Sequence, residues 1–143
     1  MKRGFRIHEH TADITLECWA PTLKEAFEEA AHATFEVMLD TSTVKPVQST
    51  RVTVSGIDLK ELLVEWIGRL IALVDIQSQF FSGFEVTDIT EKPDGWALEA
   101  VIQGEDVDLD RHVTRTGIKA MTYADMRIET KPKSTTLWFT LDL

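Results

Sequence analysis

The segment from Thr22 to Leu39 reads TLKEAFEEAAHATFEVML and has a clear helical pattern. Its apolar residues recur at spacings of three and four, which places them on one face of an amphipathic helix. Thr22 and Glu25 match the capping box, in which two side chains satisfy the free N–H groups of the first helical turn. The spacing therefore predicts a helix over 22–39 with one buried face.

A second segment, from about Leu59 to Val74, repeats this pattern, and Asp58 and Glu61 repeat the capping-box spacing at its start. Outside the two helices, apolar and polar residues alternate with period two, which is typical of β-strands. The segments with this alternation are 14–19, 51–55, 84–89, 96–102, 118–122, 126–130 and 137–141.

The turn Lys92-Pro93-Asp94-Gly95 predicts an antiparallel hairpin, because proline fixes φ and glycine accepts a positive φ. The order of elements is then strand, helix, strand, helix and at least four further strands, which is β-α-β-α-β-β-β-β in its shortest form. This order favours an α+β fold of mainly antiparallel β-sheet with two α-helices packed on one side. We expect one domain over residues 1–143, since 143 residues is an ordinary domain length.

The charge and composition exclude several classes of protein. With 24 acidic and 15 basic residues, the net charge is -9, which argues against strong direct nucleic-acid binding because that affinity comes from Lys and Arg. Cations and basic partners suit such a chain better. The sequence has no apolar run long enough for a membrane helix or a signal peptide, and the single Cys18 forms no internal disulfide. We expect a cytoplasmic protein without a membrane partner.

Recognisable catalytic motifs are absent from the sequence, which contains no Gly-rich phosphate loop, no Gly-x-Ser-x-Gly and no His-Glu-x-x-His. His8 and His10 have the spacing of a strand-borne metal pair, but such pairs more often have no function. Cys18 has no neighbouring cation to depress its pKa, which disfavours a nucleophile. The acidic run 105–110 lacks the glycine and the bidentate Glu of a calcium loop and predicts a solvated face. These motifs therefore identify no catalytic residues.

Asp13 and Asp142 stand at strand boundaries, and the terminal carboxylate of Leu143 follows the second of them. If one sheet brought these groups together, a hard cation such as Mg²⁺ or Ca²⁺ would neutralise their repulsion. The alternative is that Asp13 caps a local turn and Asp142 lies at a frayed end, and spacing alone favours it. Two interpretations of Lys119 also stay open: it is either an exposed strand lysine without a specific role or a positive charge that lies beside the two acids.

An ordered series of short motifs runs through the chain. It comprises His10-Thr11-Ala12-Asp13-Ile14, Thr22-Leu23, Glu25-Ala26-Phe27, Ala30-Ala31, Val44, Pro46, Asp58-Leu59, Leu62-Leu63, Trp66, Gly104-Glu105, His112, Ile118-Lys119-Ala120-Met121-Thr122-Tyr123 and Leu141-Asp142-Leu143. With these separations, the sequence resembles the archease family over essentially all 143 residues. Thr15, Met121 and Ala124 depart from the family pattern, and none of them is one of the charged residues.

The resemblance implies a non-catalytic protein cofactor of the GTP-dependent tRNA-splicing RNA ligase, which promotes guanylylation of the ligase's active-site histidine and multiple turnover. It also implies a divalent metal, Mg²⁺ or Ca²⁺. The family's metal-binding acids fall on Asp13 and Asp142, with the Leu143 terminus as a further ligand, and its essential lysine falls on Lys119.

Three further residues have a less definite place in the expected site. Asp58 is either a helix cap, the favoured interpretation, or a third metal ligand. His10 and His112 match family positions, and we expect them to form hydrogen bonds around the site rather than to bind metal.

Two alternative functions stay open at this point. The first is a chaperone-like modulator of a tRNA methyltransferase, a role also associated with the family. The second is a metal-dependent phosphohydrolase that uses the same carboxylates, although the sequence offers no evident general base for it.

Overall fold

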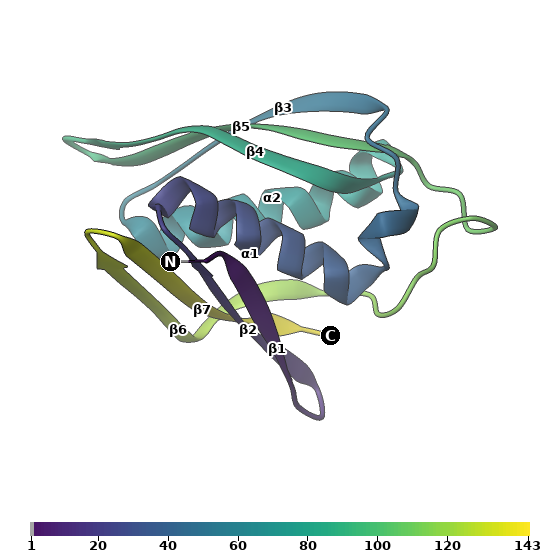
Figure 1. Cartoon of the computed structure of the whole chain (residues 1–143), viewed down its shortest axis with the longest axis horizontal. Helices are drawn as coiled ribbons and strands as arrows, with labels where there is room; N and C mark the ends of the chain where they lie inside the picture. The colour runs from purple at the N-terminus through teal and green to yellow at the C-terminus, as the bar shows by residue number, and fades with distance from the viewer. Residues whose placement is uncertain (1) are drawn as a thin grey trace.

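The computed structural model describes residues 2–143, with seven strands in two antiparallel sheets. The elements are β1 (Gly4–Glu9), β2 (Asp13–Ala20), α1 (Leu23–Met38), the 3-10 turn η1 (Thr41–Thr43), β3 (Gln48–Gly56), α2 (Leu59–Gln77), β4 (Gln79–Lys92), β5 (Gly95–Asp106), β6 (Ala120–Lys131) and β7 (Ser134–Asp142). One sheet has the strand order β1-β2-β7-β6 and the other β3-β5-β4 (Figure 1).

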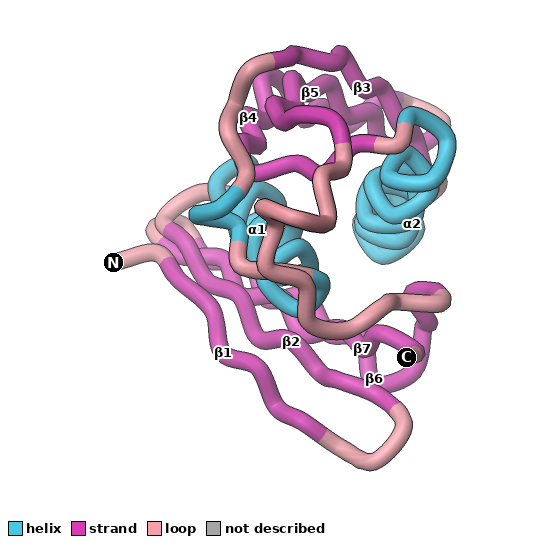
Figure 2. Tube along the Cα trace, turned by 90° about the vertical axis from the view of Figure 1, so that its right-hand side faces the viewer, coloured by secondary structure: helices cyan, strands magenta, loops and turns pink. Residues whose placement is uncertain are grey.

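Both helices lie between the two sheets (Figures 1 and 2). Helix α1 packs against β2 and β4, and α2 packs against β3 and β6, so each helix touches both sheets. Each sheet therefore has one face covered by helix and one face turned to solvent. The predicted α+β class and order of elements are confirmed, with the helices on one side of each of two sheets.

Strand β1 is an addition to the predicted strands. Its residues from Arg6 to Glu9 are all exposed, because β1 is an edge strand that pairs only with β2. An edge strand with so little burial lacks the period-two alternation that marks a half-buried strand. The sequence pattern therefore predicted β2 as the first strand and missed β1.

The predicted helix starts are confirmed by hydrogen bonds. The Thr22 hydroxyl accepts from the Glu25 backbone N–H at 3.2 Å, and the Asp58 carboxylate accepts from the Glu61 N–H at 2.8 Å. Helix α2 runs three residues beyond the predicted Val74 to Gln77, and its C-cap residue Ser78 has a left-handed φ of 52°.

The core fills the space between the sheets. Its largest fully buried side chains are Phe27, Phe35, Trp66, Phe81 and Phe139. The indole N–H of Trp66 donates to the carbonyl oxygen of Phe27 at 2.9 Å, which joins α2 to α1. Cys18 is also buried there, and burial raises the pKa of its thiol well above the ordinary value, as expected for a thiol without a nucleophilic role.

The predicted hairpin at 92–95 joins β4 to β5, with Lys92 paired to Gly95. Glycine is required at 95 because its φ is +148° and a Cβ there would lie 2.3 Å from the Gly56 carbonyl oxygen. None of the helices within residues 2–143 is long and apolar enough to cross a membrane.

Residues 107–119 connect the two sheets and pass the C-terminal end of α1 (Figure 1). The backbone N–H of Asp40 donates to Val113 at 2.8 Å, and that of Arg115 donates to Met38 at 2.8 Å. These bonds fix the course of an otherwise irregular connection. The connection ends at Lys119, immediately before β6.

Candidate functional site

Asp13 and Asp142 lie directly opposite each other in the antiparallel pair of β2 and β7. The next pair along, Ile14 and Leu141, is buried in the core. Because side chains alternate along a strand, both carboxylates project from the opposite, solvent-facing side of the sheet. Side chains so placed have Cβ atoms about 5 Å apart. The two acids, 129 positions apart in the sequence, are thus neighbours in space.

Backbone hydrogen bonds bring Lys119 and the chain end to the same place. The Lys119 N–H donates to the Asp142 carbonyl at 2.8 Å, and the Leu143 N–H donates to the Ala12 carbonyl at 3.3 Å. We call this group of Asp13, Lys119, Asp142 and the Leu143 carboxylate the acidic corner.

The structure bears on the alternative interpretation of the two acids. Asp142 is paired on both sides, with Asp13 and with Ala120, so it does not lie at a frayed end. Across the described residues, neither carboxylate nor the Lys119 amine forms a hydrogen bond or ion pair. The charged side-chain groups of the corner therefore have no partner within the described part of the chain.

The donor set at the corner suits a hard cation, because carboxylate oxygens are the ligands that Mg²⁺ and Ca²⁺ prefer. Like charges directly opposite each other in a sheet are also unfavourable unless something neutralises them. However, no group of three His, Cys, Asp or Glu side chains surrounds a common point within residues 2–143. The two Asp side chains and the terminal carboxylate fit a cation only if water or another molecule completes the coordination.

Asp58 serves as the N-cap of α2, where its carboxylate accepts the Glu61 N–H. That role uses the side chain for helix stability. The hydrogen bonds described for this carboxylate include none to the acidic corner. The structure thus agrees with the cap interpretation of Asp58.

The two histidines of the motif series lie in different places. His10 is exposed in the β1–β2 turn, and its backbone N–H donates to the Asp13 carbonyl at 3.1 Å, so it adjoins the corner. His8 lies on β1, where its ring contacts Glu17 at 3.2 Å. Since β1 ends at Glu9, His8 and His10 do not share a strand face.

His112 is buried in the 107–119 connection and takes no part in the corner. Its Nδ1 accepts the Asp108 N–H at 3.0 Å, so Nε2 carries the proton that faces Glu105 at 3.0 Å. The ring packs edge-on against Phe80. His112 therefore does not form the hydrogen bonds around the site that the sequence predicts, because its bonds fasten the 107–119 connection to the end of β5.

Glu105 was missed as a site residue, because the sequence places it in a solvated acidic run. Its carboxylate accepts from Arg111 at 2.6 Å and from the Lys45 backbone N–H at 2.6 Å, while Arg111 also donates to the Thr43 carbonyl. These bonds, led by that from Arg111, lower the pKa of Glu105 to about 2. We call Glu105, Arg111 and His112 the Glu105 clamp. The only sequence signal was the presence of Glu105 and His112 in the motif series.

The rest of the acidic run agrees with the solvated interpretation. Asp106, Asp108 and Asp110 are exposed. The run thus combines one clamped carboxylate with three that face water.

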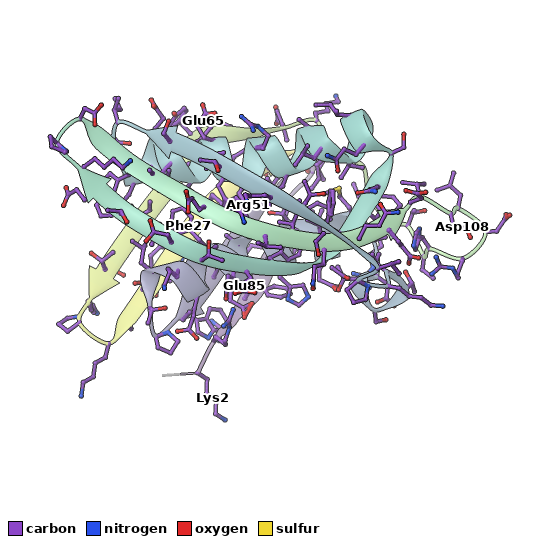
Figure 3. All side chains as sticks on the ribbon, turned by 90° about the horizontal axis from the view of Figure 1, so that it is seen from above. Lys2, Phe27, Arg51, Glu65, Glu85 and Asp108 are labelled. Carbon is purple, nitrogen blue, oxygen red and sulfur yellow. The ribbon has the colours of Figure 1, made fainter. Side chains whose placement is uncertain are left out.

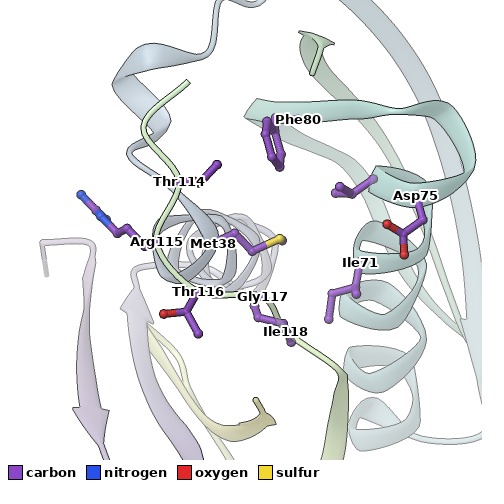
Figure 4. Close-up of a pocket in the computed structure, with 10 residues that line it drawn as sticks. Met38, Ile71, Asp75, Phe80, Thr114, Arg115, Thr116, Gly117 and Ile118 are labelled. Atoms are coloured by element: carbon purple, nitrogen blue, oxygen red, sulfur yellow. The ribbon is translucent and has the colours of Figure 1, made fainter. Parts of the chain in front are cut away.

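A surface cavity of about 320 Å³ lies beside the same connection (Figure 4). Its apolar wall includes Met38, Ile71, Phe80 and Ile118, and the Asp75 carboxylate stands at its edge. The segment 114–118 forms one side of it. The cavity contains none of the corner residues and is a separate feature.

Comparison with known proteins gives consistent relatives over the whole chain. A model of the Archease protein family matches residues 5–143. The protein named archease from Sulfurisphaera tokodaii is 44% identical over 139 residues, which cover 97% of this chain and 98% of that protein. The protein of the same name from Aeropyrum pernix is 39% identical over 140 residues, with 98% and 97% covered.

Solved structures agree with these relatives. The solution structure of Methanobacterium thermoautotrophicum protein 1598 has a TM-score of 0.82 and 33% identity, and the match covers 98% of this chain and 99% of that one. A crystal structure from Thermotoga maritima, described as an archease and possible chaperone, has a TM-score of 0.57 at 19% identity, with 95% and 94% covered, and shows the shared fold. The chain therefore belongs to the archease family.

Proposed function

We propose that this protein is a non-catalytic activator of a GTP-dependent tRNA-splicing RNA ligase. The observation that carries the proposal is the pairing of Asp13 with Asp142 beside Lys119, at the positions to which the family resemblance assigns the essential acids and lysine. The protein acts by presenting the acidic corner to the ligase, where it promotes guanylylation of the ligase histidine.

Asp13, Asp142 and the Leu143 carboxylate would hold a Mg²⁺ or Ca²⁺ ion, with water or ligase oxygens in the remaining positions. When bound, such an ion offsets the negative charge of a nucleoside triphosphate. Strand pairing holds the two Asp side chains on one face of the sheet, so the ligands need little reordering when the ion binds.

Lys119 contributes a single positive charge at the same place. Its backbone bond to Asp142 fixes where the side chain begins, while the exposed amine is free to reach a phosphate or to balance the carboxylates. Both uses place the lysine at the contact between this protein and the triphosphate-bearing site of the ligase.

The test is multiple-turnover RNA ligation with purified ligase, GTP and divalent metal. We expect Asp13→Asn, Asp142→Asn and Lys119→Ala each to reduce the activated rate by about tenfold or more, as expected when an ion site or its charge partner is lost. Asp94→Asn and Lys24→Ala change exposed residues elsewhere and should leave the rate unchanged. Full activation by the Asp13→Asn protein would refute the proposal.

The same variants separate the alternatives. A chaperone-like action on a methyltransferase would survive Asp13→Asn, because it would not require the acidic corner. A phosphohydrolase would release phosphate from nucleotides or RNA without ligase, whereas the proposal expects no release by the isolated protein.

A further inference from the structure

The solvent-facing side of the four-stranded sheet carries a row of large side chains across all its strands. Arg6 on β1 pairs with Glu17 on β2, Glu17 with Trp138 on β7, and Trp138 with Arg127 on β6. Leu16, the chain neighbour of Glu17, is fully buried on the other side. We call the side that bears this row the open face.

Two tryptophans on the open face are each covered by an arginine. The Arg127 guanidinium lies 4.3 Å from the ring centre of Trp138, and that of Arg6 lies 5.3 Å from Trp19. Both tryptophans are half-buried. Figure 2 shows no helix, strand or loop over the side of this sheet that faces away from the helices. Trp and Arg are the residue types that contribute most to binding at protein interfaces. The open face thus has the composition of a contact surface.

The open face is continuous with the acidic corner. Asp13 projects from the same side of β2 as Glu17, since four positions separate them and side chains alternate. Thr15 and Thr140 lie between the corner and the row, with their hydroxyl oxygens 3.1 Å apart. One partner can therefore contact the corner and the open face at the same time.

The size of the open face fits a partner that binds and leaves. The eight residues of β2 span about 26 Å, and four strands span about 19 Å, which gives about 500 Å² on this side. Stable interfaces bury about 800 Å² on each partner, whereas transient ones are smaller. The open face therefore suits an exchanging protein partner better than a permanent second copy of this chain.

The charges on the open face disfavour RNA as the occupant. Arg6 lies 3.9 Å from Glu17, and Arg127 lies 3.5 Å from Glu129, so both guanidinium groups already have acidic partners. Binding to a phosphate backbone would need free basic groups. Strand alternation also places Lys131 on this side. The four carboxylates on this side, those of Asp13, Glu17, Glu129 and Asp142, outnumber its three basic side chains, Arg6, Arg127 and Lys131.

We propose that the open face is the surface on which the RNA ligase docks, with Trp138, Arg127, Trp19 and Arg6 as its main contact residues. This inference rests on the proposed function, because the ligase is the partner that the corner is there assigned to reach. The corner supplies the activating groups, and the open face supplies the affinity and orientation.

The experiment titrates this protein against ligase in the turnover assay and measures direct binding by calorimetry. We expect Arg127→Glu and Trp138→Ala to raise the half-maximal concentration and the dissociation constant by about tenfold or more, while the rate at saturation stays near that of wild type. Asp13→Asn should do the reverse, losing the saturating rate but keeping most of the affinity. Arg51→Glu, on the exposed side of the three-stranded sheet, is the matched control (Figure 3).

The outcomes are separable. Unchanged affinity in both Arg127→Glu and Trp138→Ala would overturn the docking surface, and Arg127→Glu covers the case in which the Trp variant fails to fold. Binding of single-stranded RNA by the isolated wild type, or a dimer that Arg127→Glu dissociates, would assign the face to another occupant and overturn it too. If wild type binds ligase without activating it, the proposed function fails, while loss of that binding in Arg127→Glu would still support the docking surface.

Discussion

The Glu105 clamp and the acidic corner both bring charged residues together, the clamp within residues 105–112 and the corner from opposite ends of the chain, but only the clamp pairs them with other groups of the chain. Both carboxylate oxygens of Glu105 are bonded, to Arg111, His112 and the Lys45 backbone. At the corner, Asp13 and Asp142 face each other with no described partner. This difference indicates that charged groups bonded to other parts of the chain stabilise the fold. Charged groups that a sheet holds in place without a partner in the described chain are available to bind another molecule.

The largest effect on stability is expected at the clamp. His112→Ala removes two hydrogen bonds from a buried ring and leaves Glu105 without one donor, so the free energy of unfolding should fall by about 2–3 kcal/mol. Urea denaturation followed by circular dichroism measures this. An unchanged midpoint would show that the clamp is not structural.

The second largest effect is expected on lowering the pH, because protonation of Glu105 should weaken the clamp. The pKa of Glu105 is lowered to about 2 from 4.5, so its stabilising contribution is complete above pH 4.5 and is lost as the pH falls from 4.5 toward 2. The melting temperature should therefore drop more steeply over this interval in wild type than in Glu105→Gln. Parallel curves for the two proteins would contradict the assigned role.

Removing a charge from the acidic corner should increase stability, whereas removing one from the Glu105 clamp should decrease it. Asp142→Asn removes a like-charge pair across the sheet, so without divalent metal it should raise the free energy of unfolding by up to about 1 kcal/mol. The same substitution should reduce the ligase-activated rate by about tenfold or more. A clear loss of stability would mean that Asp142 is structural like Glu105, and the comparison would fail. The Asp94→Asn protein provides the baseline.

The smallest expected effect is at His32 on α1, between Glu29 and Glu36. The carboxylates of Glu29 and Glu36 lie 3.9 Å and 3.5 Å from the ring nitrogens of His32, and their interactions with the ring, led by that of Glu29, raise the pKa of His32 above 6.5. Its contribution is present below pH 6.5 and is lost as the pH rises through the raised value. The side chain is 43% exposed, so the change should be about 0.5 kcal/mol. Denaturation at pH 6 and pH 9 should show this difference in wild type, and His32→Gln should remove it.

Local signals in the sequence predicted both helix starts. The Thr22 and Asp58 caps act over three residues, and the turn at Gly95 is equally local. Strand β1 was missed because an edge strand buries too little to show a period. The partners of Glu105 were missed because side-chain contacts across an irregular connection leave no periodic pattern.

The acidic corner could be suspected from strand boundaries, although spacing alone favoured the alternative. Its assembly depends on the register of β2 against β7, which joins the two ends of the chain. The open face depends on the same long-range register, so Arg6, Trp138 and Arg127 could not be grouped from their positions in the sequence. Side-chain alternation gives the face of each strand, but it does not give its neighbours.

Ion binding at the acidic corner is the central claim, and calorimetric titration of the isolated protein with Ca²⁺ and with Mg²⁺ tests it most directly. We predict saturable binding of one ion per wild-type chain, loss of that binding in both Asp13→Asn and Asp142→Asn, and its retention in Asp94→Asn. Absence of binding to wild type, or equal binding by all four proteins, would contradict the account.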